Sequence, residues 1–263
     1  MALQIGTASF ANKYGIMNKE ILEDRSEIKK IIDFCINKNL LLDSSPTYGL
    51  SLESIVNTAY KRKAKIATKV LIENQSLEQF SLNLRNHIKS LKSCDIEILY
   101  FHEPRISHKE EFLNFQRKAF EICKEFEIPK LGLSIYSPDD LCDSYVDFNL
   151  LNIVQCPINL LDTSNLILFK KYPSIEIVSR SILMQGLLTE NGIKLLLNSE
   201  NNQDRENAIQ IISLAKNNHT NIETLSMEFV LMHEEIQNLL IGVNNFQQLI
   251  INYHQYNDAL KVA

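Results

Sequence analysis

The sequence predicts a closed barrel of eight parallel strands surrounded by helices, a (β/α)8 fold in which residues 1–263 form one domain. Eight short apolar segments alternate with helical patterns at a fairly even spacing, and no linker rich in Pro, Ser or Gly divides them. An open, doubly wound sheet is the competing fold. Its usual glycine motifs are absent, because none of the seven glycines forms Gly-x-Gly or Gly-x-x-x-x-Gly-Lys.

The expected strands are short apolar runs that end at a turn or a proline. At 40–42, three leucines lead into Asp43, and Ser-Ser-Pro then stops the strand because proline cannot donate to a ladder. By the same criteria, strands are expected at 3–7, 40–42, 65–70, 96–102, 130–134, 152–155, 175–179 and 239–241.

Helices are expected where apolar residues recur every three or four positions. In 76–91, Phe80, Leu84 and Ile88 share one face, and Ser76 is a plausible N-cap. The other helices are expected at 26–37, 51–60, 109–125, 204–216, 222–232 and 245–256, with a loop at 180–192.

Charge and hydropathy exclude several classes of partner. The net charge is −5, and the longest block of like charge is Lys61-Arg62-Lys63, which argues against nucleic acid or an acidic membrane as the main partner. No apolar run approaches the ~18 residues of a membrane span, and the first residues lack the pattern of a signal peptide. We therefore expect a cytoplasmic protein. The sequence does not indicate its oligomeric state.

The cysteines predict a reduced core rather than disulfides or zinc, because none of them forms a Cys-x-x-Cys pair. They are Cys35, Cys94, Cys123, Cys142 and Cys156.

Three neighbouring strands end in ionisable residues. The second strand ends at Asp43, the third at Lys69 and the fourth at His102, while Tyr48 follows in a loop. Each alone has an ordinary structural explanation, as a turn residue, a snorkelling lysine, a hydrogen-bonded histidine or a packing tyrosine. Together they indicate a site, because adjacent strands lie about 5 Å apart and the carboxyl rim of such a barrel carries the chemistry.

The chemistry that fits these four residues is proton donation by the tyrosine. A phenol has a reference pKa of ~10, and a buried Lys69 ammonium beside it would lower that pKa. Asp43 would keep Lys69 charged, and His102 would hydrogen-bond the reacting oxygen.

On these motifs the chain resembles the aldo-keto reductases over nearly its whole length. The resemblance implies a barrel that binds NADP or NAD in extended form and passes hydride to an aldehyde or ketone. The family's catalytic tetrad falls here on Asp43, Tyr48, Lys69 and His102. The matching segments are Gly6-Thr7-Ala8, Leu42 to Gly49, Ile66 to Lys69, Leu99 to His102, Leu131 to Ser134, Val154-Gln155, Arg180-Ser181 with Gln185 to Thr189, and Ile241-Gly242.

The resemblance also implies the cofactor contacts. Ser134 and Gln155 would hold the nicotinamide carboxamide. The further implied contacts are Gly6, Thr7, Arg180, Ser181, Leu183, Gln185, Gly186, Gly242, Asn244, Gln248 and Asn252. Two positions depart from the family: Ile135 replaces an asparagine, and Arg180 replaces a tyrosine that stacks on the nicotinamide, although a guanidinium can also stack on a ring.

The last predicted helix bears on cofactor choice. Relatives that bind NADP usually place a lysine or arginine there against the adenosine 2′-phosphate, whereas residues 241–252 contain none. Gln248 stands where an arginine is common and Ile251 where a polar residue is common, so a phosphate would rely on backbone N–H groups at the helix start. We expect weak discrimination between NAD and NADP, unless a Lys or Arg reaches in from elsewhere.

Substrate choice is expected to depend on the loops 10–14 and 103–108 and on the segment after Arg180. No long loop follows the last helix before Ala263, which suggests an open pocket and a bulky substrate such as a sugar or a nucleotide-linked sugar. Two other functions stay open. One is a barrel lyase or aldolase in which Lys69 forms a Schiff base, and the other is a nicotinamide-nucleotide-binding barrel with regulatory or interaction roles and little turnover.

Overall fold

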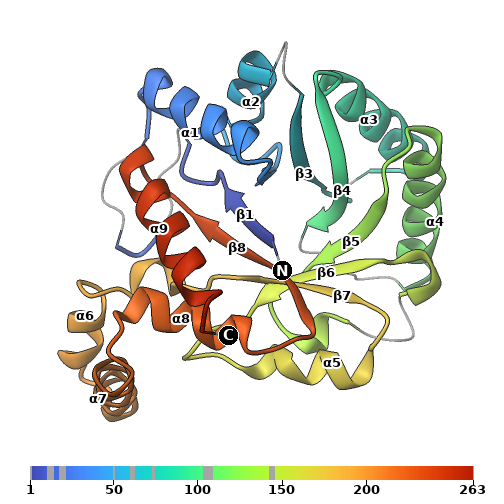
Figure 1. The fold of residues 1–263 in the computed structure, drawn as a ribbon. Coiled ribbons are helices and arrows are strands. Elements are labelled where there is room, and N and C mark those ends of the chain that lie inside the picture. Colours follow the sequence, from blue (N-terminus) through green and yellow to red (C-terminus); the bar gives the residue numbers. More distant parts are fainter. Residues whose placement is uncertain are drawn as a thin grey trace.

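Eight parallel strands close into a barrel in the order of the sequence (Figure 1). The computed structural model describes residues 2–10, 15–17, 22–49, 51–59, 63–72, 75–102, 109–141 and 146–262. The strands are β1 (Ala2–Gly6), β2 (Leu41–Asp43), β3 (Ala64–Val70), β4 (Cys94–His102), β5 (Lys130–Ser134), β6 (Ile153–Pro157), β7 (Glu176–Arg180) and β8 (Ile236–Gly242). Because β8 pairs with β1 along its length, the sheet has no open edge, and the predicted (β/α)8 fold is confirmed.

Helices surround the barrel (Figure 1). They are α1 (Arg25–Asn37), α2 (Ser51–Ala59), α3 (Leu77–Ser90), α4 (Lys109–Glu125), α5 (Ile167–Lys171), α6 (Ile193–Leu197), α7 (Asn202–Asn217), α8 (Ile222–Leu231) and α9 (Phe246–Ala259). Every predicted helix is present, and Ser76 caps α3 by accepting a hydrogen bond from the Gln79 N–H. The sequence did not predict α5 and α6, because five residues are too few to display a helical period.

The apolar core has two layers because side chains alternate across each strand. On β4, Phe101 packs outward against Phe80 and Phe112 of the helices, whereas Tyr100 points into the barrel. Only strand residues form the fully buried inner cluster, which consists of Ala67, Ile98, Tyr100, Ile153, Val178 and Leu240. Gly132 makes room for the Tyr100 ring, since a Cβ at Gly132 would stand 2.8 Å from Tyr100 Cδ1.

The strand register brings the predicted site residues to one level of the barrel. Gly6 lies opposite both Asp43 and Gly242, and Ser134 lies opposite both His102 and Gln155. Since all strands are parallel, these residues meet at the carboxyl rim.

The four described cysteines are buried, free thiols, as predicted, and Cys142 lies outside the described residues, as do Lys61 and Arg62. Burial raises the pKa of the Cys35 and Cys123 thiols to about 12. None of the helices in the described part of the chain has the length and hydropathy that a membrane crossing requires. The described residues also contain no group of three His, Cys, Asp or Glu placed to hold a metal ion.

Candidate active site

A buried ion pair forms the centre of the site. The Lys69 ammonium donates to Asp43 Oδ1 at 2.5 Å, and both side chains are almost fully buried. The other carboxylate oxygen accepts from Gln155 Nε2 at 2.8 Å, so both oxygens of Asp43 are paired. Burial lowers the pKa of Lys69, the Asp43 carboxylate opposes that effect, and the positive charge of Arg180 lowers the pKa further.

Tyr48 and His102 complete the predicted tetrad. A turn after β2 carries Tyr48, whose N–H donates to the Ser45 carbonyl at 3.0 Å. The Lys69 Nζ lies 5.2 Å from the centre of the Tyr48 ring, and the Tyr48 and His102 rings meet edge to face with centres 6.1 Å apart. Because Tyr48 and His102 line the same cavity, the structure brings together the four residues that the sequence proposed.

A network of hydroxyl groups supports the strand end at Asp43. Thr7 Oγ1 donates to the Asp43 carbonyl at 2.9 Å, Ser51 Oγ donates to Thr7 Oγ1 at 2.5 Å, and the Ser44 and Ser51 hydroxyls lie 2.7 Å apart. All three side chains are fully buried. Thr7 was predicted to contact the cofactor, but its side chain lies in this network and not on the cavity wall. The sequence analysis did not predict the roles of Ser44 and Ser51. The one signal in the sequence was their proximity to Asp43 and Tyr48.

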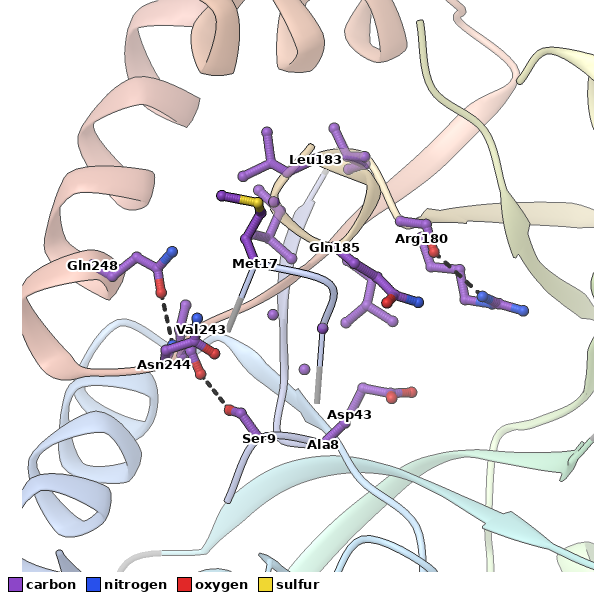
Figure 2. A pocket seen from close by; sticks show the side chains of 18 of the residues that line it. Ala8, Ser9, Met17, Asp43, Arg180, Leu183, Gln185, Val243, Asn244 and Gln248 are labelled. Atoms are coloured by element: carbon purple, nitrogen blue, oxygen red, sulfur yellow. Dashed lines mark hydrogen bonds between the residues drawn. The ribbon is translucent and has the colours of Figure 1, made fainter. Parts of the chain in front are cut away.

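A cavity of about 460 Å³ extends from three of the four tetrad residues, Asp43, Tyr48 and His102, to Asn244 and Gln248 at the start of α9. In Figure 2, Asp43 and Arg180 lie at one side, Asn244 and Gln248 at the opposite side, and Met17 and Gln185 between them. Eleven predicted cofactor residues line it: Gly6, Ser134, Gln155, Arg180, Ser181, Leu183, Gln185, Gly186, Gly242, Asn244 and Gln248. Asn252 lies outside the lining. Its side chain is buried, and its amide nitrogen has no hydrogen-bond partner among the described residues.

The loop after β7 covers part of this cavity. Its backbone has positive φ at Ser181, Met184, Gln185 and Gly186. The Met17 N–H donates to the Gln185 carbonyl at 3.3 Å, so the segment 15–17 rests on this loop (Figure 2). Gly186 is suited to its place because φ is 94° and an added Cβ would stand 2.7 Å from the Met17 Cβ.

Arg180 stacks on an aromatic ring, and that ring is Tyr136. The guanidinium carbon lies 4.4 Å from the ring centre, Nη2 donates to the Ile135 carbonyl at 3.0 Å, and Nη1 donates to Ser181 Oγ at 3.3 Å. The Ile135 side chain is buried in the outer core, so it presents no polar group to the cavity. The sequence reasoning missed Tyr136, although an aromatic residue two positions after β5 is a usable signal.

The N–H groups at the start of α9 were expected to be available to a phosphate, but side chains of the protein already accept from three of them. The Phe246 N–H donates to Glu27 Oε1 at 2.9 Å, the Gln248 N–H to Asn245 Oδ1 at 2.7 Å, and the Asn244 N–H to Gln248 Oε1 at 2.7 Å. Helix starts attract acceptor groups of this kind. Among the described residues that line the cavity, Arg180 is the single Lys or Arg.

Of the loops expected to set specificity, 103–108 lies outside the described residues, as does 10–14 except for the buried Phe10. The third, after Arg180, is described and lines the cavity with Thr189 and Asn191.

The parallel barrel thus carries a buried Asp–Lys pair, a tyrosine and a histidine together at its carboxyl rim. The chain matches the model of the aldo/keto reductase family over residues 2–261, and it belongs to that family. It is therefore an oxidoreductase.

Solved structures similar to the chain agree in fold. They include glycerol dehydrogenase from Gluconobacter oxydans, with a TM-score of 0.71 and 17% identity over 98% of this chain and 90% of that one. A protein from Pseudomonas aeruginosa that is named as an aldo-keto reductase has a TM-score of 0.68 at 17% identity, with the same coverage of 98% and 90%. At this identity the likeness concerns the fold. No curated protein matches the chain at the level of sequence.

Proposed function

We propose that this chain reduces an aldehyde or a ketone with NADH or NADPH. The observation that carries the proposal is a cavity that Asp43, Tyr48 and His102 line at one end and that reaches the start of α9. Its volume of about 460 Å³ falls in the usual range for ligand sites.

The four tetrad residues have separate roles in this proposal. The bound cofactor supplies a hydride to the carbonyl carbon. As the C=O π bond breaks, the oxygen takes a proton from the Tyr48 hydroxyl, and the resulting phenolate regains a proton from solvent. Lys69 stabilises the phenolate, Asp43 keeps Lys69 charged and in place, and His102 donates a hydrogen bond to the reacting oxygen.

The proposed cofactor contacts follow the cavity wall. Ser134 and Gln155 would hold the nicotinamide carboxamide, and Ser134 Oγ now donates to Gln155 Oε1 at 3.1 Å. Arg180 would stack on the nicotinamide with the face that Tyr136 leaves open. The β7 loop and the start of α9 would contact the rest of the dinucleotide. Polar Gln185, Thr189 and Asn191 line the same cavity, which supports a hydroxylated substrate such as a sugar or a nucleotide-linked sugar.

A second candidate is a barrel that binds the nicotinamide nucleotide with little turnover. Two observations favour it: Ile135 supplies no polar group, and Gln155 is already bonded to Asp43. The Schiff-base alternative has no such support, because the Lys69 amine is buried in an ion pair with Asp43.

The test is a screen of aldehydes and ketones with each reduced cofactor, in which the absorbance of reduced nicotinamide reports oxidation. Cofactor binding is measured separately by fluorescence. Carbonyl-dependent oxidation supports the reductase. Tight binding without oxidation favours the second candidate, and absence of binding contradicts both. Borohydride should trap no adduct of a carbonyl compound on Lys69.

A further inference from the structure

The cavity holds a positive charge, that of Arg180, which no carboxylate of the described residues neutralises. Among the described residues that line it, Asp43 is the single carboxylate, and both of its oxygens are occupied by Lys69 and Gln155. Arg180 has no carboxylate within ion-pair distance among the described residues, and its contacts are the Ile135 carbonyl, the Ser181 hydroxyl and the Tyr136 ring. The cavity therefore favours a ligand that brings a negative charge.

The protein also fixes the orientation of this charge. The Tyr136 ring supports one face of the guanidinium, and two hydrogen bonds hold its edge in place. A guanidinium carries more N–H groups than these two bonds use, and its planar fork matches the two oxygens of a carboxylate or a phosphate. Such a pre-oriented donor loses little conformational entropy when an anion binds.

Arg180 is close to the reacting groups. It stands at the carboxyl end of β7 and lines the same cavity as Tyr48 and His102. Its charge reaches Lys69, because it is one of the causes that lower the Lys69 pKa. An anion bound to Arg180 would therefore lie within the same site as the carbonyl that Tyr48 protonates.

We propose that Arg180 is a specificity residue that selects carbonyl substrates bearing a carboxylate or a phosphate, an inference that rests on the proposed reductase function. The role uses the N–H edge of the guanidinium, whereas stacking on nicotinamide uses its face, so the two are compatible. Arg180 could instead bind the phosphates of the cofactor. The experiment therefore keeps the cofactor constant and changes only the charge of the substrate.

The experiment compares 4-carboxybenzaldehyde with 4-formylbenzamide, two aldehydes of equal size of which only the first is an anion. At saturating cofactor, wild type should prefer the anion, with a ratio of kcat/KM values of about ten or more. Arg180→Gln should reduce this ratio about tenfold, and Arg180→Lys should keep most of it. The wild-type ratio should also fall as salt is added. Comparing the ratio of the two kcat/KM values between wild type and variant removes the effect of the aldehydes' intrinsic reactivity. It also removes any loss of cofactor binding that affects both substrates equally.

Arg205→Gln is the matched control, because it removes a positive charge on α7 that does not line the cavity. Its ratio should equal that of wild type. An unchanged ratio in Arg180→Gln, or an equal fall in the control, would overturn the proposal. If wild type reduces no aldehyde, the reductase function fails instead. In that case, calorimetry comparing the binding of 4-(hydroxymethyl)benzoate with that of its amide still decides the inference. A preference for the anion that Arg180→Gln abolishes would support it. Equal binding of the two compounds to wild type would refute it.

Discussion

Asp43 and Lys69 pair where little solvent reaches them, and such a pair contributes little net stability to a fold. Removing two charges from water costs several kcal/mol per ion, which the attraction between them repays only with good geometry and further hydrogen bonds. Here Gln155 supplies one of those bonds. In the proposed function, this pair acts on the phenol of Tyr48, whose ring centre lies 5.2 Å from the Lys69 Nζ.

Replacing Tyr48 by phenylalanine should remove most of the reductase activity and leave cofactor binding nearly intact. The ring packing stays and only the proton donor is lost, and general acid catalysis is worth ~10²–10⁴ in rate. Single-turnover measurements would check the chemical step directly. Tyr136→Phe is the control within the same cavity, since it should keep its rate. More than about a tenth of the wild-type rate in Tyr48→Phe would disprove the assignment.

Replacing Lys69 by methionine should damage catalysis and also stability. The variant leaves the Asp43 carboxylate buried without its cation, which commonly costs ~3–5 kcal/mol. The double variant Lys69→Met with Asp43→Asn should regain part of that stability and none of the activity. Urea unfolding and turnover assays on the three proteins would measure both effects. Activity restored in the double variant would show that the lysine has no catalytic role.

At the scale of elements, the contact between α1 and the start of α9 bears on cofactor choice. Glu27 of α1 accepts the Phe246 N–H, and this bond and Lys30 lower the pKa of the Glu27 carboxyl. In the proposed function, this region would receive the adenosine 2′-phosphate of NADP. The Glu27 carboxylate, which pairs with Lys30, would repel such a phosphate.

We therefore expect NAD and NADP to bind with dissociation constants within about a hundredfold of each other, or roughly 2.7 kcal/mol. Glu27→Gln should improve the relative binding of NADP several-fold, because it removes the repulsion and keeps a group that accepts the Phe246 N–H. Asp33→Asn, which removes a carboxylate from the same helix where it pairs with Lys29, is the matched control. Titrations at two ionic strengths would test this. A preference for NADP above a hundredfold that weakens with salt would reveal a cation elsewhere in the site.

At the scale of the whole molecule, His87 links α3 to the barrel and makes stability depend on pH. Its Nε2 lies 2.8 Å from the Thr68 hydroxyl on β3, and burial lowers the pKa of His87 to about 4 from an ordinary 6.5. Between these values the unfolded chain binds a proton that the native protein does not. The contribution of neutral His87 to stability is therefore expected to be fully present above about pH 6.5 and to be lost as the pH falls toward about 4.

The loss at His87 should approach ~3 kcal/mol across that window. Urea unfolding at a series of pH values would measure it. His87→Gln keeps a polar contact with Thr68 and should flatten the pH dependence. His219→Gln, at an exposed turn, should leave it unchanged. If the two variants gave the same slope as wild type, the pH dependence would have to arise from other groups.

The sequence alone determined the barrel and its tetrad, because both depend on local pattern. Apolar runs that alternate with helical periods specify parallel strands, and a parallel barrel places every strand end on one rim. Asp43 and His102 each end a strand and Lys69 is the second-to-last residue of its strand, so their convergence followed from their positions.

Only the tertiary structure decided which partners these residues meet. Tyr136 stacks on Arg180, Gln155 bonds Asp43, and Glu27 accepts an N–H at the start of α9. These partners come from segments far apart in the chain. They meet because barrel closure sets the strand register and the packing of α1 against α9, which no local pattern encodes.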